Sequence, residues 1–128
     1  QLLDDTYNAN PDSVRAGIDV LAATIGRKVL VLGAMGEIGE MSGQFHDEVG
    51  GYAKSQGIDR LYTLGELAEV ASRNFGEGGQ HFGSADALAQ ALIPELGPDV
   101  TVLIKGSRFM KMEQVVALLA DESVQEIH

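Results

Sequence analysis

Short apolar runs alternate with longer amphipathic stretches along this chain. Two of the runs, 28–32 and 100–104, are nearly continuous and rich in β-branched residues, as expected of strands that are covered on both faces. Further strands are predicted at 2–3, 61–64 and 80–82. The stretches between them repeat apolar residues at helical spacing, and they predict helices at 11–25, 42–56, 66–75, 84–94 and 108–121. This alternation predicts an α/β sandwich with a mostly parallel sheet.

The predicted helices carry start and stop signals. Pro11 suits a first helical position, because its missing N–H would be unpaired there, and Ser42 is a candidate N-cap. Gly26 and Gly57 are the predicted ends of the first two helices. We find no internal repeat, low-complexity tract or linker between these units.

Composition fits one globular domain. The chain has 128 residues, of which 45% are hydrophobic, so we expect a single domain over residues 1–128. It has no run of about 18 apolar residues and no basic-then-apolar start, so neither a membrane span nor a secretion signal is predicted, and we expect a cytoplasmic protein. With no cysteine and three scattered histidines, disulfides, thiolate chemistry and a zinc site are not predicted.

The charge balance argues against a nucleic-acid partner. The formal net charge is −10, and only nine residues are Lys or Arg, without the clustering that phosphate backbones require. An anionic substrate would have to be met by a few placed cations or a metal ion, and not by the general field of the protein. Lys105 and Arg108, which follow a predicted strand, are candidates for such cations.

A dense group of polar residues follows the first predicted strand. Residues 4–12 contain three aspartates and two asparagines, together with Tyr7 and Pro11. They would lie at the carboxyl end of a strand, the edge at which open parallel sheets bind ligands. Asn10 could equally cap the following helix with its side-chain oxygen. The residues alone leave both interpretations open.

No phosphate-binding loop of the Gly-x-x-x-x-Gly-Lys-Ser/Thr type occurs in the chain. The domain alone is therefore not expected to be a catalyst. Residues 33–39 contain three glycines after a predicted strand, but their spacing differs from the Gly-x-Gly-x-x-Gly of dinucleotide-binding proteins, which disfavours a nicotinamide-dependent enzyme.

Three segments resemble sequence blocks of the Mur ligases. They are Asp4 to Pro11, then Val31 to Gly39 followed by Ser42 and His46, and then Leu103 to Arg108 followed by Met112 and Glu113. The blocks occur in the family's order and cover nearly the whole chain. The resemblance implies a three-layer, Rossmann-like α/β/α sandwich. It also implies that the chain is the C-terminal domain of a larger ligase, with a UDP-substrate domain and a central ATP-binding domain upstream.

Within that family, the blocks resemble those of ligases that add D-alanyl-D-alanine to UDP-N-acetylmuramoyl-tripeptide during peptidoglycan precursor synthesis. The resemblance implies ATP with Mg2+, bound mainly by the central domain, and an acyl-phosphate intermediate. It implies that this domain closes over the reacting centre and excludes water. The expected partners are the UDP-linked tripeptide, D-alanyl-D-alanine, ATP and the covalently linked upstream domains.

The matching motifs also imply roles for individual residues. Contacts to ATP and its ribose are expected from Asp4, Asp5, Tyr7 and Asn8, and contacts to the dipeptide from Asn10, Lys105, Ser107 and Arg108. A carboxylate is an acceptor that suits ribose hydroxyls, and a lysine with a neighbouring hydroxyl suits a carboxylate. Arg108 could instead pair with Glu113. His46 matches a histidine of the family pattern, and a structural role is favoured for it because no nucleophile–base pair is apparent.

One residue departs from the family pattern. An aspartate usually follows the glycine that ends the second strand, and Ala34 stands there in this chain. Glu37 and Glu40 are the nearest carboxylates that could substitute for it. The same absence disfavours an alternative class, a free-standing binding or receiver-like regulatory module, which would carry its phosphoacceptor aspartate at the end of that strand.

Overall fold

The computed structural model of the chain describes residues 2–4, 11–33 and 42–106, and in these it contains one parallel sheet. The five-stranded sheet has the order β1-β5-β2-β3-β4, and every neighbouring pair is parallel. The strands are β1 (Leu2–Asp4), β2 (Arg27–Gly33), β3 (Arg60–Leu64), β4 (Gly79–Phe82) and β5 (Val100–Lys105). The predicted α/β fold with its mostly parallel sheet is confirmed.

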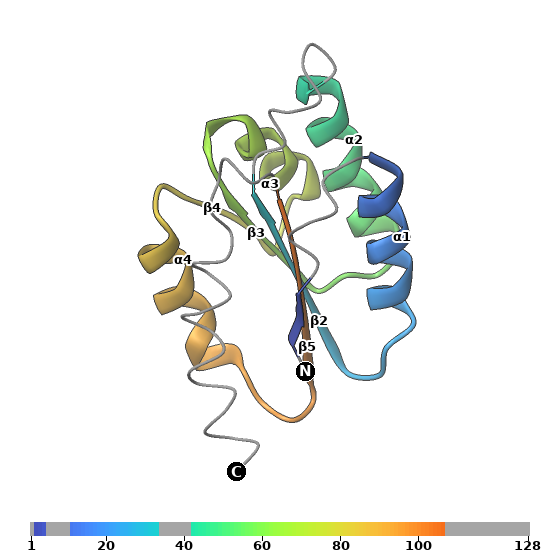
Figure 1. The fold of residues 1–128 in the computed structure, drawn as a ribbon, viewed down its shortest axis with the longest axis vertical. Coiled ribbons are helices and arrows are strands. Elements are labelled where there is room, and N and C mark those ends of the chain that lie inside the picture. The colour runs from blue at the N-terminus through green and yellow to red at the C-terminus, as the bar shows by residue number, and fades with distance from the viewer. Residues whose placement is uncertain (1, 5–10, 34–41, 107–128) are drawn as a thin grey trace.

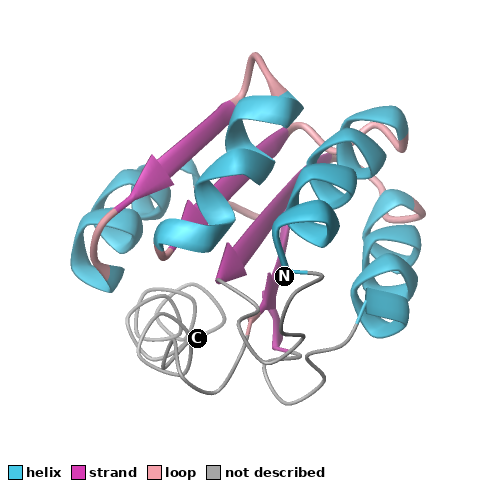
Figure 2. Cartoon of the chain, turned by 90° about the horizontal axis from the view of Figure 1, so that it is seen from above, coloured by secondary structure: helices cyan, strands magenta, loops and turns pink. Residues whose placement is uncertain are grey.

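Helices cover both faces of this sheet (Figures 1 and 2). They are α1 (Pro11–Ala22), α2 (Ser42–Ser55), the 3-10 turn η2 (Glu66–Ala68), α3 (Glu69–Phe75), α4 (Ala85–Leu92) and the 3-10 turn η3 (Ile93–Glu95). The chain steps in one direction from β2 to β4 and then returns to β5. Right-handed crossovers therefore place α1, α2 and α3 on one face and α4 on the other.

The predicted helix boundaries differ from the structure at three places. The predicted helix at 66–75 begins as the 3-10 turn η2, and its α-helical part is α3. The first helix stops at Ala22, and not at 25, and beyond it the Thr24 N–H and hydroxyl both donate to the Leu21 carbonyl, at 3.1 and 2.7 Å. Gly26 then turns with a φ of 93°. The fourth helix is regular only to Leu92, since the following turn contains Pro94 and is a 3-10 helix. The predicted helix at 108–121 lies outside the described residues.

Alternate residues of the central strands enter two separate hydrophobic clusters. Leu30, Leu32 and Leu103 face α1, α2 and α3, whereas Val29 and Val31 face α4. Because both faces are covered, apolar residues occupy most positions of these strands, which explains the nearly continuous runs in the sequence. No helix within the described residues is long and apolar enough to cross a membrane.

Helices α2 and α3 approach each other at Gly50. A methyl group built on Gly50 would lie 2.2 Å from the carbonyl oxygen of Ala71, so the two backbones are in direct contact there. One turn away, the Asn74 side-chain amide donates to the Asp47 carbonyl at 2.5 Å. Glycine at position 50 is therefore a requirement of the helix packing.

A hydrogen bond joins α1 to α2 nearer the surface. The Tyr52 hydroxyl donates to a carboxylate oxygen of Asp19. This hydrogen bond, with smaller contributions from desolvation and from the negative charge of Asp19, raises the pKa of Tyr52 above its usual value.

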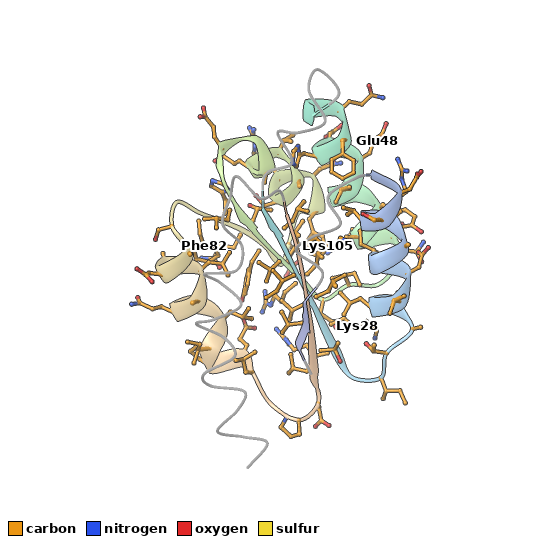
Figure 3. All side chains as sticks on the ribbon, in the orientation of Figure 1. Lys28, Glu48, Phe82 and Lys105 are labelled. Atoms are coloured by element: carbon orange, nitrogen blue, oxygen red, sulfur yellow. The ribbon has the colours of Figure 1, made fainter. Side chains whose placement is uncertain are left out.

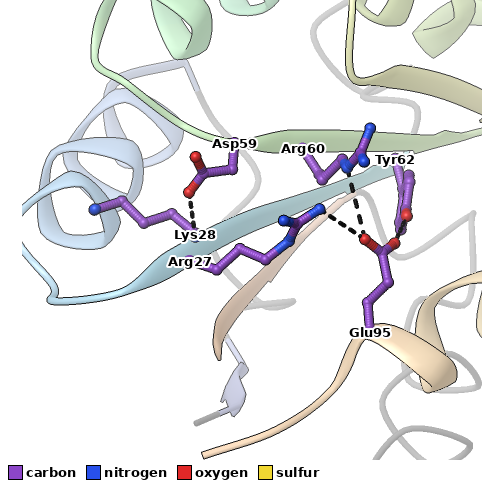
Figure 4. A network of polar contacts seen from close by, with 6 residues as sticks. All are labelled: Arg27, Lys28, Asp59, Arg60, Tyr62 and Glu95. Carbon is purple, nitrogen blue, oxygen red and sulfur yellow. Dashed lines mark hydrogen bonds and ion pairs between the residues drawn. The ribbon is translucent and has the colours of Figure 1, made fainter. Parts of the chain in front are cut away.

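The amino-terminal edge of the sheet is held by a network around Glu95 (Figure 4). Its carboxylate accepts from the Arg27 guanidinium at 2.9 Å and from the Tyr62 hydroxyl, and it lies 3.6 Å from Nε of Arg60. These contacts fasten η3 to the starts of β2 and β3. They define the edge opposite to the one at which ligands were predicted.

Substitution of Gly50 by alanine is expected to destabilise the fold by about 1–3 kcal/mol, the usual cost of overpacking a tight contact. Gly43 is a matched control in the same helix, because nothing lies within 4 Å of a methyl group built there. Gly43→Ala should be neutral or stabilise by up to about 1 kcal/mol through helix propensity. Urea unfolding measures both, and equal effects of the two substitutions would contradict the close helix contact.

The Tyr52 hydrogen bond predicts a pH dependence of stability. The folded-state pKa lies above the unfolded value of about 10, so the stabilisation is complete below pH ~10 and is lost as the pH rises through the folded-state pKa. The stability difference between the natural protein and Tyr52→Phe should therefore shrink in urea unfolding over the pH interval that begins at about pH 10 and extends upward. A difference that stays constant over that interval would show that the hydrogen bond does not control the titration.

Candidate functional site

The candidate site lies at the carboxyl edge of the sheet, where β1, β5 and β2 end side by side. Asp4, the last residue of β1, pairs with Ile104, and Lys105, the last residue of β5, pairs with Leu32. The ends of the first and last described strands are thus neighbours, although a hundred positions separate them in sequence. The described parts of all three motif blocks therefore meet at this edge.

The position of β5 produces this convergence. All six of its residues are buried, and it pairs with β1 on one side and with β2 on the other. The return through α4 on the opposite face brings it to the interior of the sheet, beyond β2. Carboxyl ends of parallel strands at such a reversal are the usual ligand-binding edge of open α/β sheets.

Lys105 is fully buried at the end of β5 (Figure 3). It lies on the α1 side of the sheet, since it follows Leu103 by two positions, and its Cδ and Cε lie beside Gly17 of α1. Lys105 also interacts with another group of the protein. A cation in such surroundings interacts more strongly with an anion than one in bulk water, because the effective dielectric constant is lower.

His46 is also fully buried, in the second turn of α2. Its ring packs edge-on against Phe45, with ring centroids 5.3 Å apart and an interplanar angle of 67°. Within α2 it is next to a core residue and points away from solvent. This placement is that of a packing residue and supports the structural role favoured from the sequence.

The β3–β4 half of the same edge contains a polar pair that the sequence did not indicate. The fully buried Thr63 hydroxyl lies 2.8 Å from Nδ1 of the half-buried His81, its direct neighbour across the two strands. The Thr63 hydroxyl and the His81 ring are therefore hydrogen-bonding partners of each other. Among the residues that the structure describes, the strand end on the β5 half of this edge carries a cation, Lys105.

Most of the predicted site residues lie outside the described residues. These are Asp5, Tyr7, Asn8, Asn10, Ser107 and Arg108. The glycine-containing segment after β2 also begins there, at Ala34. Asp4 is described through its backbone pairing and Lys105 through its side chain, and their assigned roles stay predictions.

The residues described contain no group of three or more His, Cys, Asp or Glu side chains that could hold a metal ion. The positions bearing on the site that sequence reasoning missed are Gly17, Thr63 and His81. A glycine among the inward-facing residues of the first helix was a usable signal, because it marks a close backbone approach. The Thr63–His81 pair had no such signal, since it depends on the register of two strands.

The comparisons with known proteins all indicate the same family. The family model described as Mur ligase, glutamate ligase domain, matches residues 1–108. UDP-N-acetylmuramoyl-tripeptide–D-alanyl-D-alanine ligase of Escherichia coli K12 is 42% identical over 122 residues, which cover 94% of this chain and 27% of that protein. The ligase of the same name from Bacillus subtilis is 35% identical over 122 residues, covering 90% of this chain and 27% of that protein. The chain thus spans about a quarter of the length of these relatives.

Solved structures show the same similarity. MurF from Acinetobacter baumannii superposes with a TM-score of 0.84 at 35% identity, covering 94% of this chain and 27% of that one. MurF ligase from Thermotoga maritima, in complex with ADP, gives a TM-score of 0.80 at 29% identity, covering 98% of this chain and 29% of that one.

A double-mutant cycle tests the polar pair at the edge. Thr63→Val preserves the shape of the side chain and removes the hydroxyl, and His81→Leu removes its partner. The coupling free energy between them should be about 1 kcal/mol, the net value of one intramolecular hydrogen bond. Urea unfolding of the four proteins measures it, and a coupling near zero would mean that the two groups do not interact in solution.

Proposed function

This chain belongs to the Mur ligase family, in its glutamate ligase domain, and on that premise we propose that it is the C-terminal domain of a D-alanyl-D-alanine-adding ligase. The intact enzyme would join this dipeptide to UDP-N-acetylmuramoyl-tripeptide, with hydrolysis of ATP, in peptidoglycan precursor synthesis. Supporting this, the relatives with that name match over nearly the whole chain. The observation that carries the proposal is the placement of Asp4 and Lys105 on neighbouring strand ends.

The proposed reaction has two chemical steps. First, the terminal carboxylate of the tripeptide attacks the γ-phosphate of ATP, which gives an acyl phosphate and ADP. The amine of D-alanyl-D-alanine then attacks the acyl carbon, inorganic phosphate leaves, and the nitrogen loses a proton to give the amide. Water competes with the amine for the acyl phosphate, so closure of this domain over the centre would protect the intermediate.

In this scheme the domain binds and orients, and it does not activate the phosphate. The chain has no phosphate-binding loop, so the ATP phosphates and Mg2+ would be held mainly by the upstream central domain. Asp4, Asp5, Tyr7 and Asn8 would contact the nucleotide as the far wall of its site. Because ATP and the UDP-linked precursor are cytoplasmic metabolites, the enzyme would act in the cytoplasm.

The dipeptide would be held by its carboxylate at the end of β5. Lys105 would donate a charge-assisted hydrogen bond, and Asn10, Ser107 and Arg108 would complete the contacts. An ammonium in buried surroundings has few competing water molecules, which favours a carboxylate that arrives with its own negative charge. Fixing the carboxylate would aim the amine at the other end of the dipeptide toward the acyl phosphate.

Lys105→Met in the full-length ligase tests this assignment. Methionine retains an unbranched apolar stem and removes the ammonium, so the KM for D-alanyl-D-alanine should rise by about tenfold or more, the effect of losing one hydrogen bond to a charged group. The KM for ATP should be unchanged. Phosphate release that depends on both the dipeptide and the UDP-linked tripeptide provides the measurement.

Lys28→Met is the matched control. Lys28 lies in β2 near its amino end, away from the proposed site, where its ammonium donates to the Gly26 carbonyl at 3.1 Å. This variant should leave both KM values unchanged. An unchanged dipeptide KM in a folded Lys105→Met enzyme would remove Lys105 from the site. Absence of dipeptide-dependent phosphate release in the unsubstituted enzyme would overturn the proposed function itself.

A further inference from the structure

Gly17 stands on α1 among residues that face the sheet. Val14, Ile18 and Leu21 of the same helix are fully buried core residues, and Gly17 lies beside them within the helix. Glycine in the interior of a helix is unfavourable relative to alanine, because it loses more conformational freedom on folding. Its presence at this position therefore needs a reason in the packing.

The reason lies in what would surround a side chain at position 17. A methyl group built there would lie 3.0 Å from Cδ2 of Leu103, and 3.7 Å and 3.9 Å from Cδ and Cε of Lys105. Leu103 and Lys105 are two positions apart on β5 and point to the same face of the sheet. Leu103 therefore makes the tightest contact with this position, and the stem of the buried lysine lies beside the bare backbone of α1 at a distance where a methyl group would just touch it.

We propose that Gly17 is a positioning residue for Lys105. The backbone at Gly17 carries no side chain, and the lysine stem extends along it. We call this stretch of backbone the wall for the stem, and it fixes the position of the ammonium at the carboxyl edge of the sheet. The identity of the bound group, the carboxylate of D-alanyl-D-alanine, rests on the proposed function. The placement of the stem against Gly17 does not.

A fixed stem has a consequence for binding. A lysine free in solvent loses rotamer freedom when it engages a ligand, whereas one already held in a single path loses little. A branched side chain at position 17 would occupy this path and force the stem into another conformation. The ammonium would then be misplaced or mobile, and the effect would appear in dipeptide binding more than in the phosphorylation of the tripeptide.

Gly17→Val is the direct test, and Ala16→Val is its matched control. Ala16 is the preceding residue of the same helix and is exposed, so its variant introduces the same β-branched residue without entering the packed face. In the full-length ligase, Gly17→Val should raise the KM for D-alanyl-D-alanine by about tenfold, as for one weakened hydrogen bond to a charged group. The KM for ATP should be unchanged, and Ala16→Val should alter neither.

Lysine acylation followed by mass spectrometry reads the position of the stem without reference to activity. Lys105 is buried and should react slowly, whereas the exposed Lys54 serves as a reference in the same sample. In Gly17→Val the ratio of Lys105 to Lys54 labelling should rise, and in Ala16→Val it should not. If the valine variant does not fold, it is combined with Leu103→Val, which removes the methyl group in tightest contact with position 17, and the same directions are expected.

Leu103→Val separates positioning from simple loss of stability. It removes core volume beside Gly17 and leaves the path of the lysine open, so it should lower the thermal unfolding temperature without raising the dipeptide KM. A folded Gly17→Val enzyme with unchanged Lys105 labelling would overturn the inference. Increased labelling with an unchanged dipeptide KM would retain Gly17 as the wall for the stem, while removing the dipeptide carboxylate as the group that Lys105 binds.

Discussion

The insertion of β5 between β1 and β2 is the constraint on which the rest of this structure depends. Val102 of β5 pairs with Leu2 on one side and with Val29 on the other, so among the described strands β1 joins the sheet only through β5. The strand is buried along its whole length, and its burial contributes to the cores on both faces. Removing it would detach β1 and separate the two motif segments that the fold brings together.

The two edges of the sheet are used differently. At the amino edge, Glu95 pairs with side chains from β2 and β3 and connects η3 to the sheet. At the carboxyl edge, β5 ends in a buried lysine that could meet a ligand. The lysine stem extends into the core and lies beside Gly17 of α1, whose backbone carries no side chain. The proposed ligand contact at the edge and the packing inside the helix would therefore depend on each other.

The sequence predicted the elements well because their signals are local. The runs at 28–32 and 100–104 could only be strands covered on both faces, and Gly57 ends the second helix with the positive φ of 85° that glycine favours. The strand order is not a local property. The family resemblance therefore put Asp4 and Lys105 in the candidate site, the pairing of their strands came from the structure, and the Thr63–His81 pair was missed. The burial of Lys105 was not predicted either, because a lysine that follows a strand is ordinarily expected to be exposed to solvent.

The central claim is that the ends of β1 and β5 form one ligand site. Its most direct test is amide NMR of the full-length ligase, isotopically labelled in this domain alone, during addition of Mg-ADP and then of D-alanyl-D-alanine, with L-alanyl-L-alanine as the control ligand. The account predicts shifts at Asp4 on addition of Mg-ADP, shifts at Lys105 on addition of D-alanyl-D-alanine, none at Arg27 or Arg60 on the opposite edge, and none with the L,L dipeptide. Shifts at only one of the two strand ends over the whole series, or equal shifts with both dipeptides, would contradict it.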